Sequence, residues 1–207
     1  HYPLRRQRQM CIRDSLVTDA LRAQLRSEGW SEHELRRRCL EFLPCRSGGL
    51  LHRDDSGDCW RLSHYICESR CYDQLQSVAQ VQVMASAFGN FQRRTAALDA
   101  QCLQETIVDF HHTPRRWQAL IAAYEEDRCG RAASVRVEWE QFAHCQENYD
   151  CVEAAIAAGK IPRRVTHNDT KVSNLLFDHS GAEALCVMDL DTTCLLYTSD
   201  AADEEDS

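Results

Sequence analysis

The sequence predicts an α+β fold. Apolar residues recur every three or four positions between residues 16 and 29, and again between residues 69 and 89, which is the period of amphipathic helices. Short apolar runs bounded by turn-forming residues lie at 40–43, 59–66 and 184–188, and these runs predict strands. A length of 207 residues is enough for one domain, or for one lobe of a two-lobed protein with part of the other.

The composition is ordinary for a soluble globular protein, with 43% hydrophobic and 27% charged residues. The 32 acidic side chains outnumber the 24 basic ones, so the net charge of -8 provides no basic surface for nucleic acid or an anionic membrane. No apolar run has the length of a membrane span, and the first residues show no signal-peptide pattern. We therefore expect a cytoplasmic protein without nucleic-acid or membrane partners.

The chain has twelve cysteines, but none of them is arranged as C-x-x-C. The closest two, Cys67 and Cys71, would lie on successive turns of a helix. In a cytoplasmic α+β protein such residues are more often buried small side chains or free thiols than a disulfide framework. A metal-binding scaffold built on the cysteines stays an alternative.

Residues 16–44 predict two helices and a short strand. The apolar stripe of the first helix, which ends at Gly29, consists of Leu16, Val17, Ala20, Leu21 and Leu25. Ser31 followed by Glu34 predicts a capping box that begins a second, short helix. Residues 40–43 are then expected to form the strand.

Two hairpin strands are expected at 48–51 and 59–66, around a polar turn at 54–58. From Ser69 the pattern becomes helical, and an apolar stripe continues up to Gly89. The stripe consists of Leu75, Val78, Ala79, Val81, Met84, Ala85 and Phe88. Further helices are expected over 115–127, 132–145 and 149–158, with Gly159 ending the last.

Polar residues are concentrated between strand-like runs in the segment 161–193. The run HNDTK occupies residues 167–171, and Asn174 follows shortly after it. The next strand leads directly into Asp189. Because a hairpin turn at 178–181 joins the two strands, Asn174 and Asp189 are expected to lie close together.

These residue types suit phosphoryl transfer. Transfer of a γ-phosphoryl group requires oxygen ligands for Mg²⁺, a cation near the phosphate, and a carboxylate that orients the attacking hydroxyl and accepts its proton. Asp169 fits the base and Lys171 fits the phosphate contact. Asn174 and Asp189 fit the metal ligands. A polar turn between two core strands would explain the hydrophobic pattern, but not this choice of polar residues.

The same residues resemble a known family. THNDTKVSNLLFD at 166–178, followed by CVMDLDT at 186–192, resembles the aminoglycoside-phosphotransferase-like superfamily of small-molecule kinases, and more narrowly its N-acetylhexosamine 1-kinase group. Asn168 stands where protein kinases have the arginine of H-R-D-x-x-x-x-N. Asp189 stands where they have the metal-binding aspartate of D-F-G.

The resemblance implies a two-lobed, protein-kinase-like fold, present here in truncated form. Residues 16–68 would be the remnant of the small lobe with the hinge, and residues 69–193 the helical large lobe up to the metal-binding aspartate. Backbone groups at Ile66, Cys67 and Glu68 would meet the adenine of ATP. The family's nucleotide-covering loop and phosphate-contacting lysine would lie upstream. ATP and Mg²⁺ are the implied cofactors, and a nucleotide and a small-molecule acceptor the implied partners.

Residues 105–116 resemble a second pattern of the hexosamine-kinase group, ETIPDFHDTPxR, with Val108 in place of its proline. Asp109 and His111 would then contact the hydroxyl groups of a sugar acceptor. Alternatively, the Thr-Pro pair at 113–114 caps the helix that follows, and the segment has a structural role.

Two other polar residues of this region have supporting roles in the same interpretation. His167 is expected to brace the loop by hydrogen bonds, since Asp169 is better placed to take the proton. Asp191 would make either an outer-sphere metal contact or a hydrogen bond to the loop, and the second role is favoured.

The two ends differ from the rest of the sequence. Residues 1–15 and 194–207 follow neither the periodicity nor the family pattern, and MCIRDS and LLYTSDAADE resemble translated sequencing-adapter DNA. On this interpretation the chain is an internal fragment that is itself inactive, although its parent is an enzyme. The alternative is a basic N-terminal arm and an acidic disordered tail.

The predicted activity of the parent is ATP-dependent phosphorylation of a small hydroxyl-bearing acceptor, most closely a sugar. A choline, homoserine or aminoglycoside kinase of the same superfamily is the first alternative. A non-catalytic, nucleotide-binding pseudokinase is the second, and the intact set of Asp169, Asn174 and Asp189 argues against it.

Overall fold

A computed structural model of the chain describes residues 2–46, 48–99, 103, 109, 111–161 and 163–197. The chain forms two compact units. The first takes its described residues from 2–103 and 164–196, and the second from 109–163 together with Tyr197. Helices and short strands occur together in the first unit, which agrees with the predicted α+β class. The expected kinase-like lobes and their boundary at residue 68 stay predictions.

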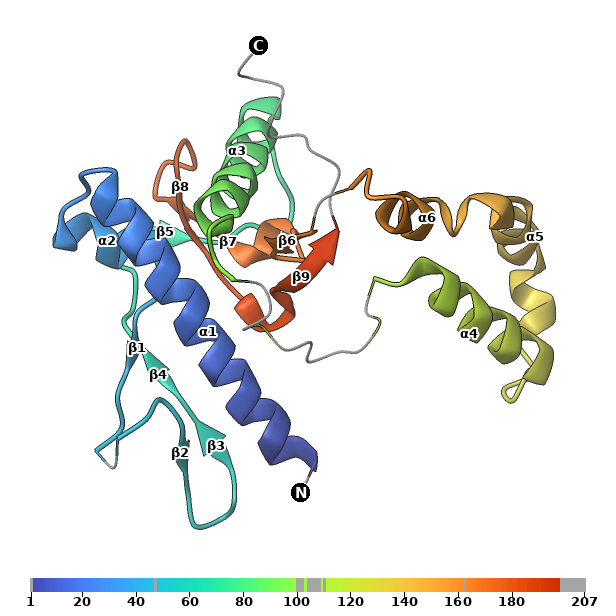
Figure 1. The fold of residues 1–207 in the computed structure, drawn as a ribbon, viewed down its shortest axis with the longest axis horizontal. Coiled ribbons are helices and arrows are strands. Elements are labelled where there is room, and N and C mark those ends of the chain that lie inside the picture. The colour runs from blue at the N-terminus through green and yellow to red at the C-terminus, as the bar shows by residue number, and fades with distance from the viewer. Residues whose placement is uncertain are drawn as a thin grey trace. The chain divides into compact units, whose positions relative to one another are not determined.

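Helix α1 (Tyr2–Ser27) contributes much of the core of the first unit (Figure 1). The predicted apolar stripe is confirmed, because Val17, Leu21 and Leu25 are all buried. The helix does not begin at residue 16 but runs without a break from Tyr2. It ends where expected, since Gly29 has a φ of 90°, a conformation that glycine adopts without strain.

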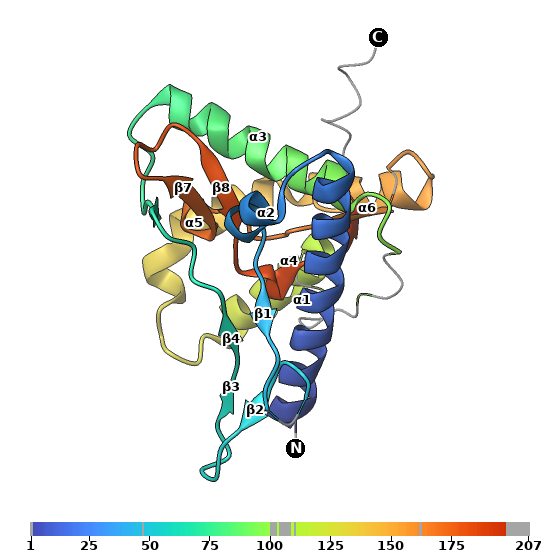
Figure 2. The same ribbon diagram turned by 90° about the vertical axis from the view of Figure 1, so that its left-hand side faces the viewer.

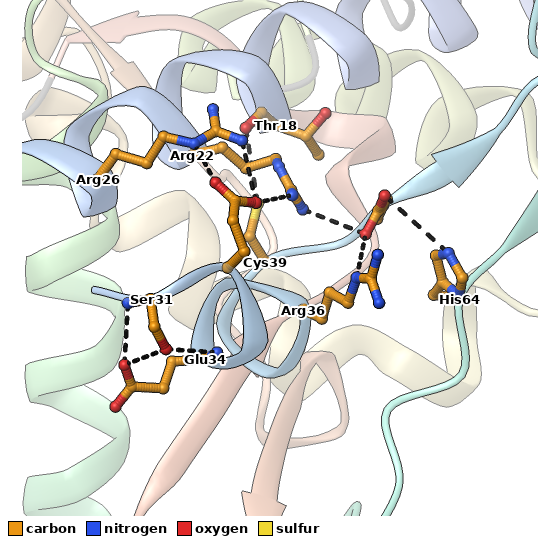
Figure 3. A network of polar contacts seen from close by, with 10 residues as sticks. Thr18, Arg22, Arg26, Ser31, Glu34, Arg36, Cys39 and His64 are labelled. Atoms are coloured by element: carbon orange, nitrogen blue, oxygen red, sulfur yellow. Dashed lines mark hydrogen bonds and ion pairs between the residues drawn. The ribbon is translucent and has the colours of Figure 1, made fainter. Parts of the chain in front are cut away.

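Helix α2 (Glu32–Arg38) begins with the predicted capping box (Figure 3). The backbone N–H of Glu34 donates to Ser31 Oγ at 3.3 Å, and the backbone N–H of Ser31 donates to Glu34 Oε2 at 2.9 Å. Arg22 and Arg26 of α1 both donate to the Glu32 carboxylate. These contacts hold the two helices together at the turn that connects them.

The short strands that follow differ from the predicted hairpin. β1 (Phe42–Leu43) pairs with β4 (Leu62–Ser63), and β2 (His52–Arg53) pairs with β3 (Cys59–Trp60), both antiparallel. The predicted turn at 54–58 is confirmed, since the Asp54 N–H donates to the Asp58 carbonyl at 3.0 Å.

Two strand predictions in this region are wrong. No strand forms at 48–51, because Gly48 and Gly49 have φ values of 83° and 76° that a strand does not allow. The run predicted at 59–66 is divided at Arg61 into β3 and β4, which pair with different partners.

A three-stranded antiparallel sheet consists of β5 (Ser69–Arg70), β7 (Leu175–Asp178) and β8 (Ala184–Val187). The predicted hairpin between β7 and β8 is confirmed, with Leu175 opposite Val187. Its turn is closed by the Asp178 N–H, which donates to the Glu183 carbonyl at 2.9 Å. Strand β6 (Arg163–Thr166) precedes this hairpin in the chain and β9 (Cys194–Tyr197) follows it. These two strands pair with each other.

Helix α3 (Val78–Thr95) lies over the β7–β8 hairpin and meets the C-terminal end of α1 (Figure 2). The predicted bounds of 69–89 are wrong at both ends. Ser69 pairs with β7 instead, and the helix begins after Ser77, whose hydroxyl caps it. It passes through Gly89 because burial of Phe91 and Thr95 outweighs the roughly 1 kcal/mol helical penalty of one glycine.

The buried face of α3 is therefore displaced from the predicted stripe. Val78 and Val81 are 75% and 51% exposed, whereas Phe91 is 4% exposed. Glu28, at the end of α1, accepts hydrogen bonds from Arg93 and Arg94 of α3. These hydrogen bonds lower the pKa of Glu28 to about 2, and the bond from Arg94 has the largest effect.

A cavity of about 600 Å³ lies within the first unit, between α1, α3 and the β7–β8 hairpin. Its walls are mainly apolar and include Leu21, Leu25 and Phe91. The thiols of Cys39 and Cys186 also line it, and burial raises the pKa of Cys39 to about 12. Thiols held neutral in this way act as small apolar side chains.

The second unit is helical, and the predicted helices are confirmed. They are α4 (Thr113–Glu126), a 3-10 turn (Ala132–Val135), α5 (Arg136–His144), a 3-10 turn (Gln146–Asn148) and α6 (Cys151–Ala157). Gly159, with a φ of 68°, ends the last. Trp139 stacks on Trp117 and Tyr124, with ring centroids 5.2 and 4.1 Å apart. Among the described residues, no helix is long and apolar enough to cross a membrane.

Candidate active site

His167 fixes the start of the polar loop to the strand that precedes Asp189. Its ring is 2% exposed and packs edge-on against Phe88 and Phe91. The Asp169 N–H donates to His167 Nδ1, so Nε2 carries the proton and donates to the Met188 carbonyl at 2.7 Å. Burial lowers the pKa of His167, which keeps the ring neutral at pH 7. His167 therefore braces the loop, as the sequence predicts.

Asn168 joins the same loop to the short helix Leu190–Thr192. Its backbone has a φ of 65°, a left-handed conformation that asparagine tolerates better than most residues. Its Nδ2 donates to the Thr192 carbonyl at 3.0 Å, and the Thr192 hydroxyl donates to the His167 carbonyl at 2.7 Å. The sequence assigns Asn168 no role beyond its place in the pattern. An asparagine at a sharp bend was the sequence feature that could have indicated this structural role.

Asp169 is the centre of a small polar cluster. Lys171 Nζ donates to Asp169 Oδ2 at 2.7 Å, and Asn174 Nδ2 donates to the same oxygen at 2.9 Å. The hydrogen bond from Lys171 is the main cause that lowers the pKa of Asp169, and the bond from Asn174 adds to it. Asp169 is therefore ionised at neutral pH.

Asp189 lies beside this cluster, at the end of β8. Its Oδ2 is 4.0 Å from Lys171 Nζ, so one ammonium group is near both carboxylates. The Met188 N–H donates to the Asn174 carbonyl at 2.8 Å, which holds the end of β8 against the start of β7. The hairpin thus brings Asn174 and Asp189 together, as its turn predicts. Asp189 is about half exposed, whereas Asn174 is almost fully buried.

The cluster fits a hard divalent cation. Two carboxylates and an amide provide oxygen ligands of the kind Mg²⁺ prefers, and Mg²⁺ commonly uses only one or two protein carboxylates together with substrate phosphates. Within the described ranges, no group of three or more His, Cys, Asp or Glu side chains could hold a metal. The donor set therefore suits a cation shared with a phosphorylated substrate better than a permanently bound zinc ion.

Asp191 has a partner that the sequence did not indicate. Arg61 Nη2 is 3.6 Å from Asp191 Oδ1, and Arg61 Nη1 also donates to the buried carboxylate of Asp14. Burial raises the pKa of Asp14, whereas Arg61 lowers it. The ion pair connects the residue two positions after Asp189 to the loop between β3 and β4.

The three hinge candidates lie together at one end of the sheet. Ile66 is 5% exposed and belongs to a small core with Leu185 and Cys186, whereas Cys67 and Glu68 are exposed. The β5–β7 register places Ser69 opposite Asp178, so the hinge candidates lie at the opposite end of β7 from Asn174. Their contact with a nucleotide stays a prediction.

The two acceptor candidates belong to the second unit. Asp109 has a φ of 57°, accepts from the guanidinium of Arg115 and, through its carbonyl, from the His112 N–H. These contacts favour the structural alternative for Asp109. The helix cap itself is His112, whose Nδ1 accepts from the Arg115 N–H, and not the predicted Thr113. An acceptor contact by Asp109 or His111 stays a prediction, and residues 105–108 and 110 lie outside the described part.

A carboxylate held ionised beside a lysine and an amide, with a second carboxylate just after the adjoining strand, is an arrangement that suits phosphoryl transfer. The comparison with protein families agrees with that chemistry. A family model described as the phosphotransferase enzyme family matches residues 44–197, which include the whole cluster.

The chain belongs to this phosphotransferase enzyme family. The predicted aminoglycoside-phosphotransferase and protein-kinase-like superfamily is thereby confirmed. The closer resemblance to N-acetylhexosamine 1-kinases stays a prediction. The match begins after α1 and α2, so the family assignment rests on the segment from Pro44 onward.

Proposed function

We propose that the enzyme to which this sequence belongs transfers the γ-phosphoryl group of ATP to a hydroxyl group of a small acceptor, most closely a sugar. The observation that supports this best is the shared hydrogen bonding at Asp169 Oδ2, with Lys171 at 2.7 Å and Asn174 at 2.9 Å. Asp189 lies 4.0 Å from the same ammonium group. The four groups combine a base, a cation and metal-binding oxygens.

In this proposal Asp169 orients the acceptor hydroxyl and accepts its proton. The lowered pKa of Asp169 keeps it ionised, as a proton acceptor must be. Asn174 and Asp189 would hold Mg²⁺, which would neutralise the charge of the nucleotide phosphates. Lys171 would contact the transferred phosphoryl group and offset its negative charge.

The hinge candidates fit the adenine end of the nucleotide. They are followed directly by β5, whose Ser69 pairs with Asp178 of β7. Asp178 lies four residues from Asn174 along the chain, which is a separation of roughly 13 Å at about 3.3 Å per residue. An extended nucleoside triphosphate bridges a separation of this order. Backbone groups at Ile66, Cys67 and Glu68 are therefore proposed to bind the base while Asn174 and Asp189 bind its phosphates through Mg²⁺.

The sugar acceptor rests on the resemblance of residues 105–116 to the hexosamine-kinase pattern, with Asp109 and His111 as proposed contacts. The choline-, homoserine- and aminoglycoside-kinase alternatives share the same phosphoryl-transfer residues. Only the acceptor distinguishes them. A pseudokinase would bind the nucleotide but phosphorylate no acceptor.

The test is an assay of ADP release in the natural chain that contains this sequence, with N-acetylhexosamines, choline, homoserine and an aminoglycoside as acceptors. Asp169→Asn should lower turnover by about 10²-fold or more while ATP affinity changes little. Asp55→Asn, an exposed acid in the β2–β3 turn, is the matched control and should retain activity. An active Asp169→Asn enzyme would exclude the proposed base. ATP binding without transfer to any acceptor would instead favour the pseudokinase.

A further inference from the structure

The ammonium group of Lys171 lies between the carboxylates of Asp169 and Asp189, at 2.7 and 4.0 Å. Both acids are part of the proposed Mg²⁺ and phosphoryl-transfer site. A divalent cation bound at Asp189 would therefore be a close neighbour of a positive charge already placed there. The two positive charges repel each other. Exposure to solvent screens this repulsion and weakens it, but does not remove it.

We propose that Lys171 and the divalent cation compete for the Asp189 carboxylate, so that cation binding releases the Lys171 ammonium toward the transferred phosphoryl group. This inference rests on the proposed function, because it takes Asp189 as a cation ligand. It assigns Lys171 a second role besides contact with the phosphate. The lysine would balance the charge of the two acids and would become available for phosphate as the cation arrives.

The local structure allows the side chain to move without the loop. The Lys171 side chain is 52% exposed, and its four-carbon stem is flexible. Its backbone is held on both sides, since the Lys171 N–H donates to the Asp169 carbonyl at 2.9 Å and its carbonyl accepts from the Asn174 N–H at 3.0 Å. The ammonium can therefore exchange partners while Asp169 and Asn174 keep their positions.

Charge balance favours the exchange. Asp169 and Asp189 together contribute two negative charges, which one ammonium neutralises only in part. A divalent cation held by Asn174 and Asp189 would supply the positive charge that Asp189 otherwise takes from Lys171, and would repel the ammonium, while Asp169 stays the proton acceptor. The phosphoryl group that arrives with the nucleotide then offers Lys171 a new anionic partner.

The sequence offers an unusually clean test, because Lys171 and Lys160 are the only two lysines in the chain. Reductive methylation with ¹³C-formaldehyde keeps the positive charge and gives each lysine a separate NMR signal. Lys160 is exposed after α6 and is the internal control. Addition of Mg²⁺ should shift the Lys171 signal and leave the Lys160 signal in place. Lys160→Arg assigns the two signals.

Cation affinity provides a second readout, measured from the electron paramagnetic resonance of free Mn²⁺. Lys171→Gln should bind Mn²⁺ about two- to fivefold more tightly, the range expected from loss of a partly exposed charge pair. Lys171→Arg should remain close to the unsubstituted chain. Lys160→Gln removes the same charge elsewhere and should leave the affinity unchanged.

The outcomes separate this inference from the proposed function. If Mn²⁺ binds but Lys171→Gln leaves its affinity unchanged and the Lys171 signal does not move, the competition is refuted and the cation site stands. If the unsubstituted chain binds no Mn²⁺ either alone or with saturating ATP, both the competition and the proposed cation site are wrong. Equal tightening by Lys160→Gln and Lys171→Gln would show that net charge, and not contact with Asp169 and Asp189, sets the affinity.

Discussion

His167 Nε2 lies 2.7 Å from the carbonyl oxygen of Met188, and this bond joins the loop that contains Asp169 to the residue immediately before Asp189. Both ends of the contact are buried or partly buried. The relative position of the two carboxylates therefore depends on a neutral side chain that belongs to neither of them.

Replacing His167 by Ala should lower the free energy of unfolding by about 2–4 kcal/mol, because it leaves the Met188 carbonyl without its donor and removes the ring from between Phe88 and Phe91. Urea unfolding measures the change. His33→Ala, on the exposed face of α2, is the control and should change stability by less than about 0.5 kcal/mol. Equal effects of the two substitutions would contradict the bracing role.

The same histidine predicts a pH dependence. Burial lowers the pKa of His167 in the folded chain below its ordinary value, so the unfolded chain binds a proton more readily. Its contribution to stability is therefore complete above about pH 6.5 and declines as the pH falls below that value. Glu28, whose pKa is lowered from 4.5 to about 2, keeps its full contribution throughout this range, because that contribution is lost only as the pH falls from about 4.5 toward 2.

The measurement is the free energy of unfolding from pH 7.5 to pH 5.5. The unsubstituted chain should lose stability over this range, and His167→Gln should show a flatter profile. Parallel profiles would mean that another group is responsible.

Gly181, in the β7–β8 turn, should not tolerate a side chain. Its φ is 77°, and a Cβ there would lie 2.9 Å from Gln80 Nε2 and closer still to the Tyr72 hydroxyl. Gly181→Ala should therefore lower stability by about 2–4 kcal/mol, from backbone strain and from the displaced side chains together. Gly29→Ala is the matched control, since Gly29 has a φ of 90° but open space around it, and should cost about 1 kcal/mol. Thermal unfolding of both variants separates the two contributions.

The sequence predicts elements well where local signals determine them. The stripe of α1, the capping box at Ser31 and the turn at 178–181 all depend on neighbouring residues, and all three are confirmed. The predicted start of α3 is wrong because Ser69 pairs with Asp178, a partner more than a hundred positions away. Two-residue strands of this kind leave no periodicity in the sequence.

In the candidate site, too, the features set by nearby residues could be predicted and those set by distant residues could not. Asp169, Lys171 and Asn174 lie within a few positions of one another, and one hairpin adds Asp189, so their grouping could be predicted from spacing. The contacts that support them could not. Arg61 pairs with Asp191, and Asn168 bonds to the carbonyl of Thr192, because tertiary packing brings distant segments together.

The central claim is that Asp189 and its neighbours bind a divalent cation used in phosphoryl transfer. The most direct measurement is Mn²⁺ affinity, by electron paramagnetic resonance, in the unsubstituted chain, in Asp189→Asn and in the control Asp55→Asn. Loss of a ligand should weaken binding about tenfold or more in Asp189→Asn, whereas Asp55→Asn should bind as the unsubstituted chain does. Equal Mn²⁺ affinity in all three proteins would contradict the account.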